Sequence, residues 1–389
     1  MPGNLRDRLK RIQRVQQGAA VSTKSPVHSV DLAFFAEQGW ASAGYLTLRR
    51  EITANEIIAL PAAMPETAGM IMPPLSGTTA YEDLLFFDLE TTGLSGGAGT
   101  MAFLAAFGRL IRSASAGRKT ALYTIHVTQY LLLDYPGENT FVEALLGEFK
   151  GGSVIVSFNG RSFDSQILKT RCFMNGVTPP EYSHADLLYP ARRLWKRMLP
   201  NCSQGTIETA ILGIDRTGDI PGAFAPEIWF SFLRNGDTAP LLGIAEHNRR
   251  DITGLAAIFS TMARIADDPF EAIQKIKFDL ETLSLRYAFA LFREGKYDEG
   301  RTWLFTIVSA EAPPPQAAAQ RILALRTLAI DSEHRLKNAA EAIAFTEQGL
   351  ELLLPDSPRR EEFERRLQRL YKKSPNNLSP GHGDQHGKK

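Results

Sequence analysis

Two carboxylates, two positions apart, end an apolar run near residue 90. The stretch reads Leu-Leu-Phe-Phe-Asp-Leu-Glu-Thr-Thr-Gly-Leu over residues 84–94. In a strand, the period of two places Asp88 and Glu90 on the same face. Buried neighbouring acids repel each other, and a bound divalent cation offsets that repulsion. Oxygen ligands favour Mg²⁺ or Mn²⁺ over zinc. Taken alone, an Asp-x-Glu pair is more typical of a strand that ends in solvent.

A second acid follows another short strand. Residues 153–157 read Ser-Val-Ile-Val-Ser, and a helix is predicted over 163–175. Between them lie Asn159 and, in the first turn of the helix, Asp164. The helix dipole also favours an acid at that position, so a purely structural role stays open here.

Two histidine–aspartate pairs complete the set of candidate residues. His247 and Asp251 are four apart on one side of a helix predicted over 241–266, where a surface ion pair is the simpler alternative. His184 and Asp186 share one face of a brief strand, which favours a structural hydrogen-bonded pair over secondary metal ligands.

The order and spacing of these residues resemble the DEDD superfamily of ribonuclease-H-like 3′–5′ exonucleases. In that superfamily Asp-x-Glu-Thr-Thr-Gly-Leu forms the first motif, Asn-x4-Asp belongs to the second, and an Asp preceded by Tyr or His forms the third. All three motifs occur here, at 88–94, 159–164 and 247–251. Within the superfamily the chain looks most like the bacterial YprB-like branch, which joins such a domain to helical repeats.

The resemblance implies hydrolysis of phosphodiester bonds with two cations, Mg²⁺ or Mn²⁺. It implies that four carboxylates hold the ions and are catalytic together with one histidine: Asp88, Glu90, Asp164, Asp251 and His247. The imidazole would accept the proton of the attacking water. The histidine stands four residues before the last Asp, whereas families of the His type use five. Glu246 occupies that other position and stays an alternative base.

The substrate is expected to be a nucleic-acid end, most simply a single-stranded 3′ end. By the same resemblance, the expected substrate-binding residues are Thr92, Gly93, Leu94, Asn159 and Arg161. Basic residues near the motifs could line a phosphate track: Arg161, Lys169, Arg171, Arg192, Arg193, Lys196, Arg197, Arg249 and Arg250.

The amino-acid composition limits the kinds of partner and cellular location that are compatible with these hypotheses. The 389 residues carry a formal net charge of +1, so any nucleic-acid binding must come from local patches. The two cysteines form no disulfide framework and are expected in the core. No secretory signal and no run of roughly 18 apolar residues is found, which predicts a cytoplasmic protein without membrane contact.

The pattern of elements predicts an α/β fold, a ribonuclease-H-like mixed sheet flanked by helices, followed by an all-α region like tetratricopeptide repeats. Three strands, over 84–89, 101–110 and 121–133, are expected to be antiparallel neighbours. The predicted divisions are a partly irregular lead-in 1–80, with a basic helix over 1–16 and one strand over 45–52, a nuclease domain 81–268, a helical domain 269–373 and a disordered tail 374–389.

These observations favour a metal-dependent 3′–5′ exonuclease in DNA repair or nucleic-acid processing, whose helical domain docks a partner such as a helicase. Two alternatives remain at this point. One is a catalytically silent nuclease fold that binds partners through its helices. The other is a structure-specific endonuclease of the same fold.

Overall fold

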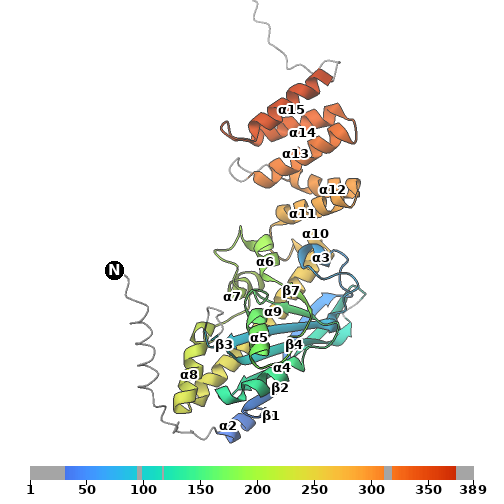
Figure 1. Ribbon diagram of the computed structural model, residues 1–389. Coiled ribbons are helices and arrows are strands. Elements are labelled where there is room, and N and C mark those ends of the chain that lie inside the picture. The colour runs from blue at the N-terminus through green and yellow to red at the C-terminus, as the bar shows by residue number, and fades with distance from the viewer. Residues whose placement is uncertain (1–30, 94–98, 116–117, 311–317, 374–389) are drawn as a thin grey trace, which may run out of the picture.

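The computed structural model describes residues 31–93, 99–115, 118–310 and 318–373. Its core is a seven-stranded mixed sheet in the order β1-β2-β5-β4-β3-β6-β7 (Figure 1). The strands are β1 Trp40–Gly44, β2 Thr47–Pro61, β3 Leu84–Thr91, β4 Ala102–Ser115, β5 Thr120–Leu132, β6 Val154–Ser157 and β7 Ser183–Asp186. β3, β6 and β7 pair in parallel, and the other pairs are antiparallel.

The described helices fall into two groups. Those that accompany the sheet are α2 Leu32–Glu37, α3 Ala68–Ile71, α4 Glu138–Leu146, α5 Asp164–Met174, α6 Leu188–Trp195, α7 Gln204–Ile207, α8 Ala225–Asn235, α9 Thr238–Asp267 and α10 Pro269–Ala272. Those that follow are α11 Leu280–Arg293, α12 Tyr297–Val308, α13 Ala319–His334, α14 Ala339–Leu352 and α15 Arg360–Lys373.

Successive side chains of β3 point alternately into two apolar layers, one on each face of the sheet. Leu84 and Phe86 pack with α9 on one face, whereas Leu85 and Phe87 pack with α4, α5 and α8 on the other. Asp88 continues the period of Leu84 and Phe86 and therefore faces α9. The strand thus brings its carboxylates to the layer that also carries the last motif.

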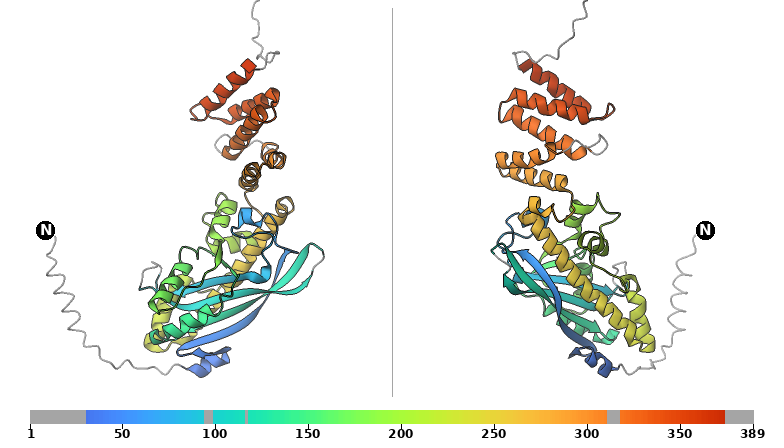
Figure 2. Two further views of the ribbon diagram at one scale, coloured as in Figure 1. Left: turned by 45° about the vertical axis from the view of Figure 1, so that its right-hand side comes forward. Right: turned by 180° about the vertical axis from the view of Figure 1, so that it is seen from behind.

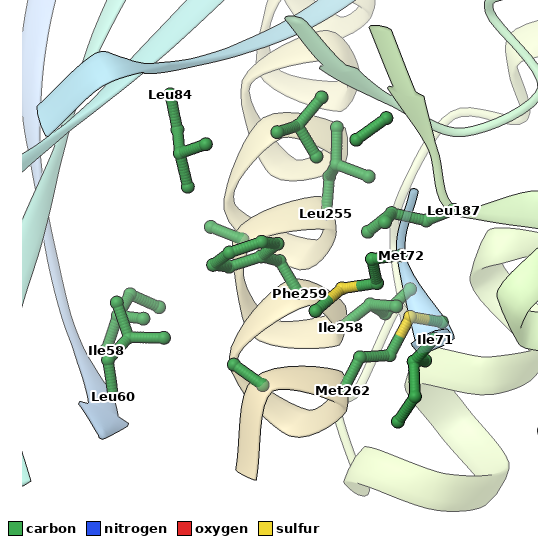
Figure 3. Packing of buried hydrophobic residues seen from close by; sticks show 14 of the residues in the cluster. Ile58, Leu60, Ile71, Met72, Leu84, Leu187, Leu255, Ile258, Phe259 and Met262 are labelled. Carbon is green, nitrogen blue, oxygen red and sulfur yellow. The ribbon is translucent and has the colours of Figure 1, made fainter. Parts of the chain in front are cut away.

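Helix α9 is the central element of that layer (Figure 3; Figure 2, right). Leu255, Phe259 and Met262 are almost fully buried there, and each such side chain contributes roughly 1.5–3 kcal/mol. The helix approaches the sheet closely at Gly108 of β4, where a Cβ atom would lie 2.5 Å from Cγ2 of Ile252. A larger residue at position 108 would push away the helical turn that contains Ile252 and, next to it, the last motif.

The three central strands form the predicted antiparallel set. The strand expected over 45–52 coincides with the first part of β2, which extends further, to Pro61, and which also forms a hairpin with β1 and pairs with β5. A register shift between Thr53 and Ile57 interrupts its alternation, which hid its length in the sequence. The proposed division at residue 81 therefore passes between two strands of one sheet. The expected helix 1–16 and tail 374–389 lie outside the described residues.

The helices α11–α15 stand at one end of the sheet domain, next to α3, α6 and α10 (Figures 1 and 2). Trp195 Nε1 donates to the Lys277 carbonyl at 2.8 Å, and the Asp279 amide donates to the Leu194 carbonyl at 2.8 Å. α11 ends before Gly295, at φ +77°, and Tyr297 begins α12. The likeness to tetratricopeptide repeats stays a prediction.

Both cysteines are buried and free, as expected. Among the described residues, no helix has the length and apolar character needed to cross a membrane.

Candidate metal centre

The first two carboxylates approach α9 from β3. Asp88 is half-buried, and its Oδ2 accepts a hydrogen bond from Asn248 Nδ2 at 2.8 Å. Glu90 is 8% exposed. The predicted placement of both acids on one strand face is therefore what the fold shows, and that face is covered rather than open to solvent.

Glu90 meets the last motif directly. His247 Nε2 lies 3.9 Å from Glu90 Oε1 and 3.3 Å from Asp251 Oδ2. One ligand atom from each of these three residues lies within 4.8 Å of the others, which is a spacing that one metal ion can bridge. The spacing of four along α9 thus turns both side chains of the motif toward the strand.

Asp164 reaches the same region from the start of α5. The preceding turn is unusual, because Asn159 adopts a positive φ of 65°. Asp186 holds this turn by accepting hydrogen bonds from the amides of Asn159 at 2.8 Å and Arg161 at 3.1 Å. The expected structural role of Asp186 is therefore to shape the turn that presents Asp164.

Burial and mutual repulsion raise the pKa values of these acids. Burial contributes most to the raised pKa of Asp88 and of Glu90, followed by the charges of Asp251 and Asp164. Burial also raises the pKa of Asp164, to about 7, with a further contribution from Asp186. The repulsion shows that the four predicted ligands share one electrostatic environment. Chemically, this set of hard oxygen donors fits a divalent cation.

A second layer of charges holds the last motif in place. Arg216 donates to Asp251 Oδ1 at 2.6 Å, to Glu208 Oε2 at 2.6 Å and to Asp219 Oδ2 at 2.7 Å. Asp219 Oδ2 also lies 2.9 Å from Nδ1 of His247. Burial raises the pKa of Asp251, and the nearby His247 and Arg216 counter that effect.

Sequence reasoning missed this second layer. Arg216 and Asp219 lie in an irregular segment whose residue pattern shows no period, and Glu208 is a fully buried acid. Glu208 fits only because α9 has Gly254 opposite it, where a Cβ atom would lie 1.7 Å from Glu208 Oε1. Each of these contacts depends on packing between segments that are distant in sequence. The one local signal was Glu208, an acidic residue within a segment whose pattern is helical.

Other predicted residues lie apart from the cluster. Glu246 pairs with Arg249 and Arg250. His184 contacts the hydroxyls of two serines, Ser157 at 2.7 Å and Ser165 at 3.3 Å, and burial lowers its pKa to about 4. His184 thus makes structural contacts, but with these serines, whereas Asp186, its predicted partner, accepts from backbone amides.

The remaining substrate candidates are placed by backbone contacts. The Thr92 amide donates to the Met101 carbonyl, and the Gly93 carbonyl accepts from the Thr91 hydroxyl. Leu94 lies outside the described residues. Arg171, expected in a phosphate track, is buried and pairs with Glu138.

A family model described as the RNase_H superfamily matches residues 85–263. The protein YprB of Bacillus subtilis (strain 168), which is uncharacterized, is 36% identical over 185 residues, or 47% of this chain and 42% of YprB. This chain thus spans less than half the length of that relative.

Two solved structures show a partial likeness. An ExoI/SSB-Ct complex matches with a TM-score of 0.25 and 17% identity, covering 43% of each chain. E. coli exonuclease I in complex with a dA16 oligonucleotide matches with the same TM-score and identity, covering 44% of this chain and 45% of its own.

The family match begins in β3, ends in α9 and encloses every carboxylate of the candidate centre. Together with the mixed sheet and its flanking helices, this match makes residues 85–263 of the chain a ribonuclease H superfamily domain.

Proposed function

We propose that this protein is a two-metal-ion 3′–5′ exonuclease that hydrolyses phosphodiester bonds at nucleic-acid ends. The observation that carries the proposal is the group of Glu90, His247 and Asp251, whose ligand atoms lie within 4.8 Å of one another. The carboxylates of Asp88 and Asp164 act on the same group through their charges. Of the four acids, Asp251 alone pairs with an arginine among the described residues, and the pKa values of all four are still raised. Divalent cations, Mg²⁺ or Mn²⁺, offset the repulsion and supply the charge that phosphoryl chemistry needs.

In this proposal Asp88, Glu90, Asp164 and Asp251 hold the two ions. Cations bound there neutralise charge on the phosphate and make water more acidic. Arg216 binds Oδ1 of Asp251, so Oδ2 is the oxygen of this carboxylate that can bind a cation. Arg216 thus fixes the orientation of this carboxylate toward Glu90.

His247 is the proposed base, and Asp219 sets its tautomer. The paired Arg216 and His247 lower the pKa of Asp219 against the opposing effect of burial, so its carboxylate is ionised and can only accept. The proton on the imidazole then lies on Nδ1, which leaves Nε2 free to take a proton from water beside Asp251. Glu246 has no comparable access, because it pairs with two arginines.

A cavity of about 760 Å³ next to α5 is the proposed entry for a single strand. Arg161, Lys169, Phe173 and His184 line it, and Arg161 stands three residues before Asp164. Phe173 is 62% exposed. Cations beside an exposed aromatic ring suit a nucleic-acid backbone with unpaired bases. Thr92 and Gly93, near Glu90 in sequence, would contact the terminal nucleotide.

The test is hydrolysis of a 3′-labelled single strand with Mg²⁺ or Mn²⁺ by the full chain and by its D88A and E90A variants. We expect mononucleotide products from linear DNA or RNA, and a loss of about 10³-fold or more in each variant, since removal of an ion ligand removes several kcal/mol of stabilisation. Asp83 is an exposed acid immediately before β3, so D83A is the matched control and should retain the wild-type rate.

Two outcomes would contradict this proposal. A wild type no faster than D88A and E90A would favour a catalytically silent scaffold. Cleavage of a closed circular strand would favour a structure-specific endonuclease of the same fold. A role in DNA repair and a helicase bound to the helical region remain predictions from the sequence, and no contact among the described residues argues for them.

A further inference from the structure

Three arginines meet at the junction between the sheet domain and the following helices. Arg193 lies in α6, and Arg286 and Arg293 lie in α11. In the part of the chain that the structure describes, none of them forms an ion pair. Arg286 Nη2 donates to the Met70 carbonyl at 2.9 Å, whereas Arg193 Nη1 and Arg286 Nε are shielded from solvent and lack a protein acceptor.

The cluster differs from the other buried cations of the helical region. Arg301 and Arg366, for example, are buried and pair with carboxylates at 2.8 Å and 3.4 Å. At the junction, burial and the charges of Arg193 and Arg293 lower the pKa of Arg286. Like charges that converge without counterions raise the energy of the folded protein, and a bound anion offsets that cost.

A groove of about 770 Å³ gives an anion access to two of these cations. Met70, Phe289, Arg286 and Arg293 are among the residues that line it, between α3 and α11. The groove therefore lies between α3 and α11, which contact each other. Figure 1 shows these two helices and α6 near one another at the end of the sheet domain. The walls of the groove combine guanidinium groups with the rings of Phe289 and Phe292, a composition that binds phosphates and unpaired bases. They also include one carboxylate, Glu294, whose charge is paired with Lys296 at 3.0 Å.

The groove is linked to the candidate centre through one short segment. Gly69 and Met70 line the groove, and Pro73 and Pro74, three to five residues later, line the 760 Å³ cavity that also contains Arg161. Arg161 in turn stands three residues from Asp164. The two hollows therefore border the same segment, one beside the carboxylates and the other at the helical region.

We infer that Arg286 and Arg293, with the charge of Arg193 beside them, bind phosphates of the nucleic-acid strand whose 3′ end lies at the carboxylate cluster. This inference rests on the proposed function and assigns the helical region a part in substrate binding. Guanidinium groups match phosphate oxygens in pairs, and a strand presents phosphates at regular intervals. From Asp251 to the end of α9 is about 24 Å at 1.5 Å per residue, so the contacts span several nucleotides. The groove and the cavity at Arg161 border the same segment of the chain, so one extended nucleic-acid strand could reach both. This favours a nucleic-acid strand over an acidic peptide.

The experiment measures binding of fluorescein-labelled dT20 to the full chain in EDTA, by anisotropy over a series of salt concentrations. We expect R193Q/R293Q to bind at least about 10-fold more weakly at 0.1 M salt. Its slope of log K against log salt should fall by about 1.4, since each single-strand phosphate that a cation neutralises contributes about 0.7. R293Q alone should reduce the slope by about half as much. Arg293 is exposed and unpaired among the described residues, so this variant leaves the packing intact.

R365Q is the matched control, since it removes the same charge from an exposed position on α15, far from the junction. Affinity and slope equal to wild type in R193Q/R293Q would overturn the inference. So would a double variant that keeps dT20 binding but no longer binds an oligoglutamate peptide, which would point to a protein partner. A wild type that binds dT20 through these arginines but hydrolyses nothing would refute the proposed function and support this inference.

Discussion

Buried carboxylates occur in two regions of this molecule, with opposite surroundings. In the sheet domain, Asp88 and Glu90 lie among other acids, and their pKa values are raised. In the helical region, Asp331 lies between Arg301 at 2.8 Å and Arg335 at 2.7 Å, and its pKa is lowered. The residue types are the same, and only the supply of cations differs.

Glu333 is the clearest case of the second kind. Arg369, Lys373 and Arg366 surround its carboxylate, and the hydrogen bond from Arg369 contributes most to lowering its pKa to about 2. The helical region therefore neutralises its own buried charges. The sheet domain leaves a negative cluster at β3, and the junction leaves a positive cluster at α11.

This difference separates structural charges from charges that await a ligand. An ion pair made within the protein holds helices together and needs nothing from outside. An unpaired cluster costs stability unless a ligand of opposite charge binds, so it is the better guide to function. The following predictions test whether the two kinds of carboxylate behave differently.

The largest effect is expected at His247. We expect H247A to lower the hydrolysis rate by roughly 10² to 10⁴, because the water no longer has its proton acceptor, while metal binding persists through the carboxylates. Single-turnover rates and calorimetric titration with Mn²⁺ measure the two properties. E246Q is the control, because Glu246 pairs with Arg249 and Arg250 outside the cluster. Unchanged turnover in H247A together with a slow E246Q would assign the base to Glu246.

A smaller loss is expected from D219N. The amide is close in size to the carboxylate but carries no charge for Arg216, and it can present a donor to Nδ1 of His247. Since such outer contacts orient the reacting groups, we expect a decrease of about 10- to 100-fold in rate. D215N, at an exposed position in the same segment, should be neutral. Equal rates in D219N and wild type would mean that the tautomer of His247 is set elsewhere.

The contrast between these residues also measures what the sequence could predict. The period of two in β3 and the period of α9 follow from local rules, so they placed Asp88, Glu90 and Asp251 toward a common layer. The family resemblance added Asp164, whose own local pattern indicated only a helix start.

The contacts that escaped prediction depend on distant partners. Arg171 was expected in a basic track, but its partner Glu138 lies 33 positions away. Arg216 and Asp219 come from a segment without period. Arg216 pairs with both Asp219 and Glu208, and Glu208 in turn packs against Gly254 of α9. Packing of that kind is invisible to a local pattern, and so is a strand such as β2, whose alternation is broken by a register shift.

The carboxylate cluster should destabilise the metal-free protein as pH rises. Because the pKa of Asp164 is raised to about 7, the folded state binds more protons than the unfolded state between about pH 4 and 7, and the free energy of unfolding falls across that range. D88N should raise it by about 1–3 kcal/mol at pH 8 in EDTA, because the variant removes one buried charge that has no counterion among the described residues. Thermal unfolding, where 1 kcal/mol corresponds to roughly 2–4 °C, measures this change.

Added Mg²⁺ provides the corresponding control. It should raise the melting temperature of the wild type more at pH 8 than at pH 5, since only ionised carboxylates bind the cation. D88N should abolish most of this gain, and D83N should keep it. A Mg²⁺ effect of equal size at both pH values would contradict the presence of a titrating cluster.

The smallest effect is expected at Glu333, and its sign is opposite. Its lowered pKa means that the carboxylate stabilises the fold above the unfolded value near 4.5 and loses that contribution as pH falls toward 2. E333Q should therefore destabilise the protein at pH 7 by about 1 kcal/mol, a value reduced by the exposure of Arg369 and Lys373 to solvent. The deficit should shrink as pH falls below about 4.5, and Mg²⁺ should leave it unchanged. E361Q, in an exposed pair with Arg365, is the control and should change stability little at any pH. A deficit in E333Q that disappears when Mg²⁺ is added would mean that the helical region, too, relies on a bound cation, and the contrast between the two regions would fail.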